Sequence, residues 1–438
     1  MKGKGKTAAA CLAFAILFVC YGKILEYILV DDTASYTRIM FHEMYEQDQI
    51  DVLFAGSSHC YRSFVPEVFD SAWGGVNSFN AGTSSQGLDG SYMIIREAAK
   101  YNDIKHIYLE LYFRMAFESY KERTEMTQTY IISDYLKPSL EKIRYLLEAS
   151  DSSHYFNSFI LARRNWQKFF EPDYVKNVLV KKQTDDYKNY AYTYVTGDVE
   201  WYAGKGYVAN KDVVKNGNFF SSFGWEQLQM DQTAADWENS LKDIIQYCDE
   251  KGIQLTLISA PMSNFMLAGI ENYDDYVEYV KRMLAGTGVE YYDFNLCREG
   301  FFPGNSELFK DPDHLNCYGA EAFSRLLADF VSKDISKDQL FYSSFQEKME
   351  CLEPTVFGIS FHEDCNEKGE TVRSCKIVSN GRLEYQIEME PNEGDSYTQQ
   401  EFSDNRFFSV SPDDHGICTV TYRLKEDLSN VRSVSIAY

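Results

Sequence analysis

The sequence predicts an α/β protein with a parallel sheet of about five strands, helices on both faces, an inserted cap and a carboxyl-terminal β-sandwich. Three observations predict this fold class. Short apolar runs alternate with stretches of helical periodicity, one long segment interrupts the alternation, and the last ninety residues or so consist of short alternating runs. At about 150 residues per domain, 438 residues suggest two to three domains.

Residues 1–30 form the first predicted element, a membrane anchor. Three lysines precede sixteen uncharged residues, 7–22, and the apolar character continues to Val30. A membrane span needs about 20 residues. A cleaved signal peptide is the alternative, but no convincing A-x-A cleavage site is present. The lysines before the run and Asp31-Asp32 after it place the amino terminus in the cytoplasm, so the rest of the chain lies outside the cell membrane.

The first part of the α/β domain spans residues 31–113. We expect buried strands at residues 50–55, 76–80 and 106–112, because each is a short apolar run bounded by polar or glycine residues. A helical pattern around residues 93–99 lies between the second and third runs.

Residues 114–232 interrupt the alternation and predict an inserted cap, since they are far too many for a crossover loop. Residues 130–147 have a helical pattern, and the second half is polar and aromatic. Its rings form a sugar-stacking surface or simply pack the cap: Tyr187, Tyr190, Tyr192, Tyr194, Trp201, Tyr202, Tyr207, Phe219 and Phe220. Gly204-Lys205-Gly206 lacks the spacing of a phosphate-binding loop.

The second part of the α/β domain spans residues 233–340. A helical pattern at residues 237–248 is followed by Gly252, a helix-stop signal, and then by a predicted strand at residues 254–260. Further patterns predict a helix at 276–284, a strand at 289–294 and a helix at 322–330. This order is typical of a parallel sheet covered on both faces.

Residues 346–438 predict the β-sandwich. Runs at 374–378 and 383–389 flank Asn380-Gly381, which predicts a hairpin. The sequence leaves open whether Cys351, Cys365, Cys375 and Cys418 pair, in one of three ways, or remain free thiols. No C-x-x-C pair occurs, so we expect no zinc or iron–sulfur site.

A candidate nucleophile follows the first predicted strand, in Gly56-Ser57-Ser58. Ligands of an open parallel sheet bind beyond the carboxyl ends of its strands. A serine that opens a helix also has free backbone N–H groups nearby, which suit an oxyanion. We therefore expect Ser58 to attack and Ser57 to line the site. Asn80 and Gly82 follow the second strand, where a glycine lets the backbone approach a substrate.

A candidate base lies just before the last predicted helix. Serine attack needs a base, and the base needs a carboxylate to orient it. Asp311 and His314 are three residues apart, so one turn of chain can present both, and Asp313 is the alternative orienting residue.

These motifs resemble the SGNH (GDSL-like) hydrolase superfamily, which has a flavodoxin-like sheet. The resemblance covers roughly residues 50–113 and 232–333. It implies that Ser58 is the nucleophile, that Gly82 and the Ser58 N–H are oxyanion donors, and that Asp311 and His314 complete a triad. The anchor and the G-[ST]-S motif are more similar to the D-alanyl-lipoteichoic acid biosynthesis protein and alginate O-acetyltransferases, which act beside a membrane-bound O-acyltransferase (MBOAT) partner.

The chain departs from the superfamily pattern after the third strand. Members usually carry G-x-N-D there, and the asparagine donates to the oxyanion. This chain instead has Glu110-Leu-Tyr-Phe-Arg114, so a third donor is missing or comes from elsewhere.

The net charge of −23 excludes a nucleic-acid binder, which needs a basic face. The expected function is an extracytoplasmic serine O-acyltransferase or O-acyl esterase acting on a cell-surface glycan, without metal or cofactor. A negatively charged protein does not attract an anionic polymer, so the glycan is neutral or is presented by the partner. The alternatives are a catalytically inactive, SGNH-like glycan-binding or scaffold protein and, third, a peptidase.

Overall fold

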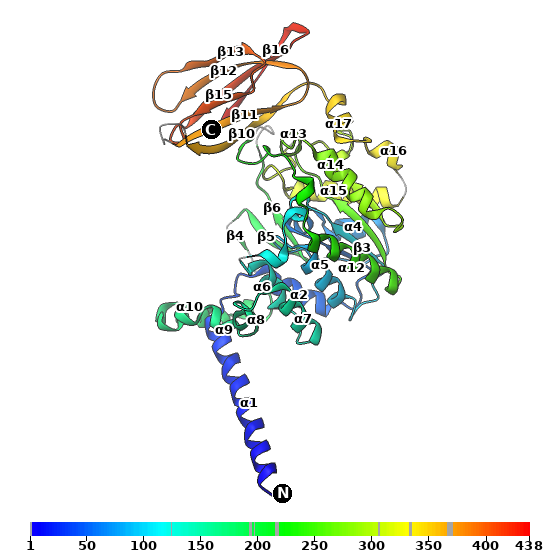
Figure 1. Cartoon of the computed structure of the whole chain (residues 1–438), viewed down its shortest axis with the longest axis vertical. Coiled ribbons are helices and arrows are strands. Elements are labelled where there is room, and N and C mark those ends of the chain that lie inside the picture. Colours follow the sequence, from blue (N-terminus) through cyan, green and yellow to red (C-terminus); the bar gives the residue numbers. More distant parts are fainter. Residues whose placement is uncertain are drawn as a thin grey trace.

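The computed structural model of the protein describes residues 2–123, 125–191, 195–196, 198–214, 219–304, 307–332, 335–365 and 371–438. A long helix projects from one end of the molecule, an α/β body lies in the middle, and a β-sandwich lies at the far end (Figure 1). Tyr192 and Tyr194 of the predicted aromatic set lie outside the described residues.

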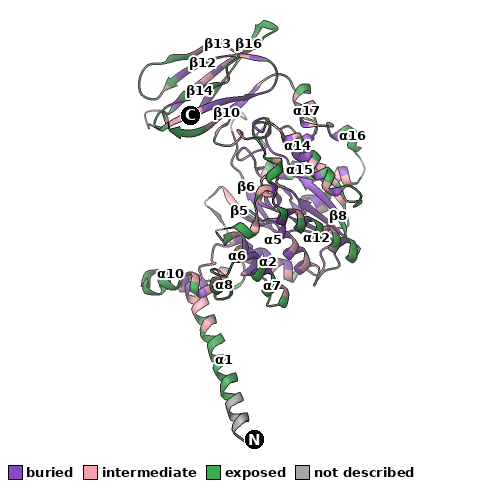
Figure 2. Ribbon diagram, viewed as in Figure 1, coloured by how far each residue is buried: buried purple, intermediate pink, exposed green. Residues whose placement is uncertain are grey.

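The central sheet has five parallel strands in the order β2-β1-β3-β8-β9, which confirms the predicted fold class. All five predicted strands are present, each shorter than predicted: β1 (Val52–Ala55), β2 (Ser78–Asn80), β3 (His106–Glu110), β8 (Gln254–Ser259) and β9 (Glu290–Asp293). Every residue of β1 and β3 is buried, because helices cover both faces. Figure 2 accordingly shows buried residues concentrated in the interior of the α/β body.

Helices flank this sheet as the alternating pattern predicts. α4 (Pro66–Trp73) packs on α15 (Cys317–Val331), whereas α5 (Leu88–Ala98) packs on α12 (Ala235–Lys251). Gly252 ends α12 in a left-handed conformation with φ +66°, as expected for a C-terminal glycine. The other helices of this body are α2 (Tyr36–Glu46), α3 (Ser58–Ser63), α13 (Asn264–Ala268), α14 (Tyr273–Leu284), α16 (Lys337–Leu340) and α17 (Phe345–Cys351).

Helix α1 (Lys2–Leu29) contains a 21-residue stretch, Ala9–Leu29, that is long and apolar enough to cross a membrane. Its mean hydropathy is 1.9, and only 6% of the most apolar window is buried within the protein. A helix of this length and composition fits a membrane anchor or a signal sequence.

The insertion after β3 is helical at first and then forms a small sheet that the sequence did not reveal. Pro138 divides the predicted helix 130–147, because proline disfavours the helical conformation of the residue before it. The helices are α6 (Thr127–Ser133), α7 (Leu140–Ala149), α8 (Tyr155–Phe159), α9 (Leu161–Arg164), α10 (Pro172–Lys182) and α11 (Asp185–Lys188), with 3₁₀ turns at Phe113–Phe117, Tyr120–Glu122 and Trp166–Phe170. The strands are β4 (Val195–Thr196), β5 (Glu200–Gly204) and β6 (Tyr207–Asn210).

The β5–β6 hairpin docks on the free edge of β2. The Asn80 N–H donates to the Lys205 carbonyl at 2.9 Å, and Lys205 Nζ binds Asp70 and Asn77 at 2.7 Å each. Gly206 has φ +81°, and a Cβ there would overlap the Asn80 carbonyl oxygen. Gly204-Lys205-Gly206 is therefore the turn of a docking hairpin.

Two sheets form the carboxyl-terminal sandwich, in the orders β14-β11-β10-β7 and β13-β12-β15-β16, and all their strand pairs are antiparallel except β10–β7. Their inner faces share one cluster of buried residues, which includes Ile359, Ile377, Ile387 and Val420. The strands are β7 (Phe219–Ser221), β10 (Val356–Cys365), β11 (Thr371–Ser379), β12 (Leu383–Pro391), β13 (Tyr397–Ser403), β14 (Phe407–Val410), β15 (Gly416–Leu424) and β16 (Asp427–Ala437).

The hairpin predicted at Asn380-Gly381 is wrong. β11 pairs with β10 and β14, whereas β12 pairs with β13 and β15, so the turn crosses from one sheet to the other. Gly381 does adopt a positive φ of +76°, but the Asn380 side chain accepts from the Thr355 N–H and donates to the carbonyls of Met349 and Leu352 at the end of α17. These contacts direct the chain into the facing sheet.

Strand β7 was predicted to be part of the cap, but it pairs in parallel with β10 and completes an edge of the sandwich. The insertion therefore connects the five-stranded parallel sheet to the sandwich. All ten cysteines are unpaired. Cys375 and Cys418 are buried in the sandwich core, whereas Cys351 and Cys365 are exposed.

Candidate functional site

Three chain segments meet at the carboxyl edge of the parallel sheet. Ser58 follows β1, Gly82 follows β2, and the loop with His314 precedes α15. Ser58 Oγ lies 2.8 Å from His314 Nε2, although the two residues are 256 positions apart in the sequence. The structure thus brings the predicted nucleophile and the predicted base into direct hydrogen-bond contact.

The turn that presents Ser58 depends on glycine and on a buried carboxylate. Gly56 has φ +154°, and a Cβ there would lie 2.6 Å from Glu110 Cβ, so only glycine fits. Ser57 caps α3 by accepting from the His59 N–H. Ser58 is the first residue of α3, and its own N–H has no hydrogen-bond acceptor among the described residues.

His314 is held by two aspartates rather than one. Its Nδ1 lies 3.0 Å from Asp311 Oδ1 and 3.0 Å from Asp313 Oδ1. The backbone N–H of His314 also donates to Asp311 Oδ1 at 2.8 Å, which ties the loop into a tight turn. Both residues weighed as the orienting carboxylate therefore contact the imidazole.

This pair of carboxylates makes His314 unusually basic. Burial lowers the pKa of His314, but the hydrogen bonds to Asp311 and Asp313 outweigh burial and raise the pKa to about 9. The same contacts hold the carboxyl pKa values of both aspartates below their usual range, although burial opposes this shift. The site without substrate therefore favours a protonated His314 beside ionised Asp311 and Asp313.

His59 and Tyr112 support this arrangement from behind, and the sequence did not single out either of them. The Tyr112 hydroxyl donates to Asp313 Oδ2 at 3.1 Å. The His59 ring is stacked between Tyr112 and His314, with ring centres at 4.0 and 4.5 Å. Burial and the neighbouring His314 lower the pKa of His59 to about 3, so its ring stays neutral. Tyr112 lies just after β3, and this position at the carboxyl end of a strand was the one sequence signal that could have placed it in the site.

Glu110 is a buried carboxyl at the end of β3, near the place where the superfamily pattern has its asparagine. Its Oε2 accepts from both the N–H and the hydroxyl of Ser57, at 2.8 Å each. Burial raises the pKa of Glu110 to about 7 despite these hydrogen bonds. Glu110 stabilises the turn through these two hydrogen bonds. When it is ionised, its carboxylate has no N–H or O–H to donate to an oxyanion.

Asn80 and Gly82 were expected to line the site, and the structure places them beside α3. Both N–H groups of the Asn80 amide are used within the protein, on the carbonyls of Cys60 and Phe64 at 2.9 and 2.8 Å. Asn80 Oδ1 accepts the Gly82 N–H at 3.0 Å. Asn80 therefore positions the loop, and the Gly82 N–H must exchange this bond before it can reach a substrate. Ser57 is likewise occupied by Glu110.

A metal-ligand cluster exists within the same site. The side chains of His59, Asp313 and His314 each place one potential ligand atom within 4.8 Å of the others. However, His314 Nε2 is hydrogen-bonded to Ser58 and its Nδ1 to the aspartates. The donor set therefore fits an acid–base site better than a cation site.

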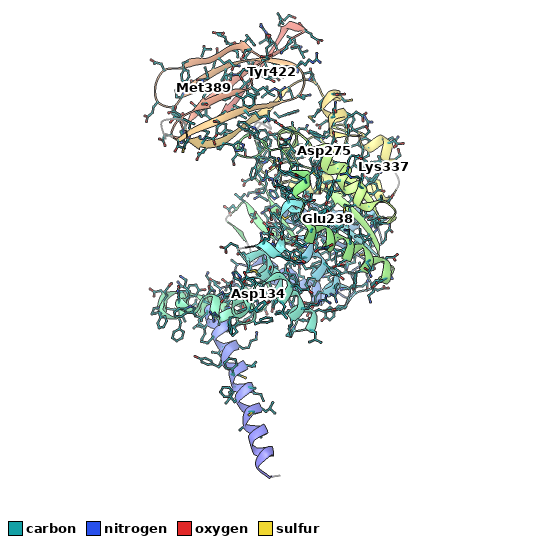
Figure 3. All side chains as sticks on the ribbon, viewed as in Figure 1. Asp134, Glu238, Asp275, Lys337, Met389 and Tyr422 are labelled. Atoms are coloured by element: carbon teal, nitrogen blue, oxygen red, sulfur yellow. The ribbon has the colours of Figure 1, made fainter. Side chains whose placement is uncertain are left out.

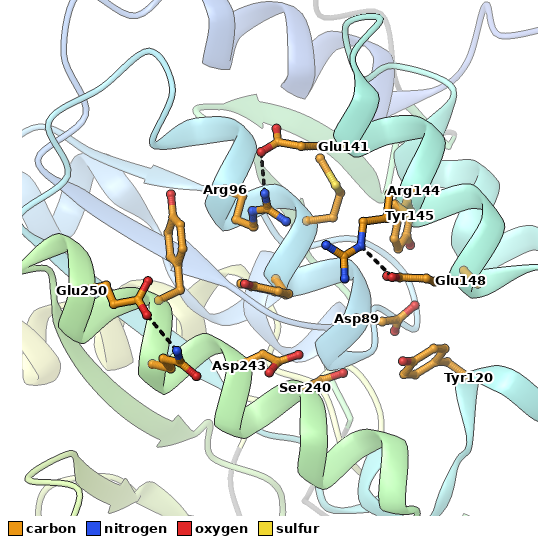
Figure 4. Close-up of a pocket in the computed structure, with 15 residues that line it drawn as sticks. Asp89, Arg96, Tyr120, Glu141, Arg144, Tyr145, Glu148, Ser240, Asp243 and Glu250 are labelled. Carbon is orange, nitrogen blue, oxygen red and sulfur yellow. Dashed lines mark hydrogen bonds and ion pairs between the residues drawn. The ribbon is translucent and has the colours of Figure 1, made fainter.

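A separate cavity of about 280 Å³ lies among α5, α7 and α12 (Figure 4). Its lining contains no residue of the serine–histidine–aspartate cluster. Two arginines there face acidic side chains, with Arg96 bonded to Glu141 and Arg144 to Glu148. The cavity is an independent polar pocket, and the chemistry described above lies elsewhere.

Comparison with known proteins adds little to this geometry. The sequence matches no family model and no curated protein. A solved structure from Streptococcus pneumonia, provisionally described as a platelet activating factor, is 13% identical, with a match over 73% of this chain and 99% of that chain and a TM-score of 0.32. A Cellulomonas fimi endo-β-1,4-mannanase double mutant is 9% identical over 93% and 99% of the two chains, with a TM-score of 0.15. Scores this low carry no argument, so the site must be interpreted from its own residues.

Proposed function

We propose that this protein is an extracytoplasmic serine enzyme that forms an acyl ester on Ser58 and passes the acyl group to a sugar hydroxyl of a cell-surface glycan or to water. The contact that carries the proposal is the 2.8 Å hydrogen bond between Ser58 Oγ and His314 Nε2, with Asp311 and Asp313 on the other ring nitrogen. A hydroxyl, a base and an orienting carboxylate in this order are the parts that acyl transfer requires.

In the first half-reaction, His314 Nε2 takes the Ser58 proton while Oγ attacks the carbonyl carbon of an O-acyl donor. The two aspartates stabilise the imidazolium that forms. The N–H groups of Ser58 and Gly82 stabilise the oxyanion, the latter after it leaves Asn80 Oδ1. The imidazolium then returns its proton to the leaving alcohol, and the acyl group remains on Ser58.

In the second half-reaction, the acceptor hydroxyl gives its proton to His314 Nε2 and attacks the carbonyl carbon of the acyl ester. The bond between that carbon and Ser58 Oγ then breaks, and the imidazolium returns the proton to Oγ. A sugar acceptor makes the protein an O-acyltransferase, and water makes it an esterase. No metal or cofactor enters either step. Because the chain carries a net charge of −23, we favour a neutral glycan or one presented by a partner.

We further propose that α1 crosses the cell membrane once, with the site on the outer side. Its 21-residue apolar stretch supports the crossing, and Lys2, Lys4 and Lys6 before that stretch support this orientation. In this position an MBOAT protein in the same membrane is the expected source of acyl groups.

Labelling with a fluorophosphonate probe tests the serine chemistry. We expect Ser58 to be labelled in the wild type, labelling to be abolished in Ser58→Ala and to fall by orders of magnitude in His314→Asn. His106→Asn is the matched control, because His106 is also buried but bonds Thr256 at the opposite end of β3. Full labelling or activity of Ser58→Ala would contradict the proposal.

A glycan-binding scaffold without catalysis is the second candidate. Two observations favour it: Glu110 offers no oxyanion donor when it is ionised, and Asn80 occupies the Gly82 N–H. Glycan binding by a folded protein that the probe never labels would support the scaffold and exclude the enzyme.

A further inference from the structure

Residues 155–182, which comprise α8, α9, the 3₁₀ turn Trp166–Phe170 and α10, expose large apolar side chains to an unusual degree. Phe170 is 72% exposed, Phe156 63% and Trp166 56%. Phe159, Ile160, Phe169 and Val180 are exposed as well. Aromatic side chains crowded on an outer surface indicate an interaction site, because isolated exposed apolar residues are common but clusters are not.

This segment, here called the juxtamembrane segment, is fixed at the point where α1 ends. The Leu29 carbonyl accepts from Asn165 Nδ2 at 3.2 Å and from the Tyr174 hydroxyl at 2.9 Å. Lys182 Nζ donates to the Val30 carbonyl at 2.6 Å. The apolar stretch of α1 also ends at Leu29. If α1 crosses a bilayer, the segment lies at the level of its outer boundary.

The surrounding fold agrees with this position. α8, α9 and α10 lie beside the carboxyl-terminal end of α1 and far from the sandwich (Figure 1). Arg164 ties the segment to the end of α6 through two hydrogen bonds to Asp134, at 2.7 and 2.9 Å. Figure 3 labels Asp134 in this region and Met389 and Tyr422 in the sandwich at the opposite end.

The juxtamembrane segment also has the opposite charge to the rest of the chain. Residues 155–182 contain six Lys or Arg and two Asp or Glu, a net charge of +4 in a protein whose total is −23. Four of the six cations form ion pairs with carboxylates: Arg164, Lys168, Lys181 and Lys182. The cations that can face lipid are therefore Arg163 and Lys176. Arg163 and Lys176 are exposed. Basic side chains beside exposed aromatic rings are typical of segments that lie in the interface of an anionic bilayer.

We propose that the juxtamembrane segment is a bilayer-binding surface, with its aromatic side chains among the lipid headgroups and its basic side chains on anionic phosphates. Trp166 suits this depth because its indole has an apolar body and a polar N–H, and phenylalanine side chains are common on the apolar face of helices that lie in the interface. The inference rests on α1 crossing the membrane, but it is independent of any chemistry at Ser58. It gives the protein a second, peripheral attachment to the lipid that carries its anchor.

Fluorescence quenching by brominated lipids tests this proposal on the full chain in nanodiscs that contain anionic phospholipid. The difference between wild type and Trp166→Phe isolates the emission of Trp166, which is exposed, so the variant keeps the fold. We expect lipids brominated near the headgroup to quench at least half of this emission, and aqueous iodide to quench little of it. Trp225→Phe is the matched control, because half-buried Trp225 contacts His362 and Phe407 of the sandwich, and its emission should not respond to the lipids.

Trp166 emission that iodide quenches and brominated lipid does not would overturn the proposal. That result would also be obtained if the surface serves a membrane-embedded protein partner instead of lipid. Because fluorophosphonate labelling of Ser58 is measured on the same sample, loss of the bilayer contact and loss of the serine chemistry remain distinguishable.

Discussion

His314 has two carboxylates on one nitrogen, and this contact sets the pH at which the site can act. The base must be neutral to accept the Ser58 proton. With a pKa of about 9, only about 1% of His314 is neutral at pH 7. We expect the rate of fluorophosphonate labelling to rise about tenfold per pH unit from pH 6 to 8 and to level off near pH 9.

Asp313→Asn should lower the midpoint of that profile, because it removes one of the two negative charges that stabilise the imidazolium. Asp103→Asn, at an exposed position, is the matched control and should leave the midpoint unchanged. An unaltered profile in Asp313→Asn would mean that Asp311 alone determines the basicity of His314.

Glu110 should make the stability of the protein depend on pH. Its folded pKa of about 7 lies above the ordinary carboxyl value of 4.5. Below pH 4.5 Glu110 is protonated in both the folded and the unfolded chain, so its ionisation does not change the free energy of unfolding. Between 4.5 and 7 the unfolded chain releases the proton first, so the free energy of unfolding falls, by about 3 kcal/mol in total, and stays lower above pH 7.

Glu110→Gln keeps an oxygen for Ser57 and removes the ionisation. The stability of this variant relative to wild type should therefore increase by about 3 kcal/mol between pH 4 and pH 8, as measured by urea unfolding. A difference that stays constant over this range would show that Glu110 does not titrate as described.

At this scale the sequence predicted which residues carry the proposed chemistry but not which residues support them. Ser58 could be predicted because it follows a parallel strand whose carboxyl end lies at the ligand-binding edge of the sheet. His314 could be predicted because it lies just before the last helix, three residues from Asp311. His59, Tyr112 and Glu110 could not. Their roles depend on ring stacking and burial across three chain segments, which no local pattern records.

The hairpin β5–β6 shows how an inserted element stabilises the sheet that carries the site. Its turn covers the edge of β2 just before Gly82. Gly206→Ala would strain a left-handed residue by about 1–2 kcal/mol and also push the turn away from Asn80. Gly288→Ala is the matched control, since Gly288 has φ +76° but nothing within 4 Å of its Cβ position.

We expect Gly206→Ala to lower the free energy of unfolding by at least about 1 kcal/mol more than Gly288→Ala, because it also loses the hydrogen bond from Asn80 to Lys205. Chemical denaturation of both variants measures this difference. Equal losses would show that the hairpin does not depend on this contact.

Whether a segment forms a helix or a strand could be predicted from the sequence better than the strands with which it pairs. The five parallel strands and their helices could be predicted from periodicity, since burial on both faces leaves a continuous apolar run. The turn at Asn380-Gly381 could not be assigned correctly, because a local turn signal does not say whether the next strand stays in the same sheet. The three residues of β7 are too few for any pattern.

The molecule as a whole has two main hydrophobic cores, one in the α/β body and one in the sandwich. Ile387 is fully buried in the sandwich core, so Ile387→Ala should cost about 2–5 kcal/mol of sandwich stability. We expect the thermal unfolding transition of the sandwich to fall while Ser58 labelling at 25 °C stays unchanged. A parallel loss of labelling would mean that the two cores unfold as one unit.

The contacts of Leu29 and Val30 with the juxtamembrane segment have a further consequence for where the protein can work. The chain leaves α1 without a slack tether, because Asn165, Tyr174 and Lys182 bind it at once. If α1 spans a bilayer as proposed, Ser58 is held within a thin layer at one height above the lipid, whereas a flexible tether would let it reach a wide range of heights. If the proposed acyl transfer to a long surface polymer also holds, the modified units should be those that pass through this layer, and the pattern of acylation would record the height at which the protein works.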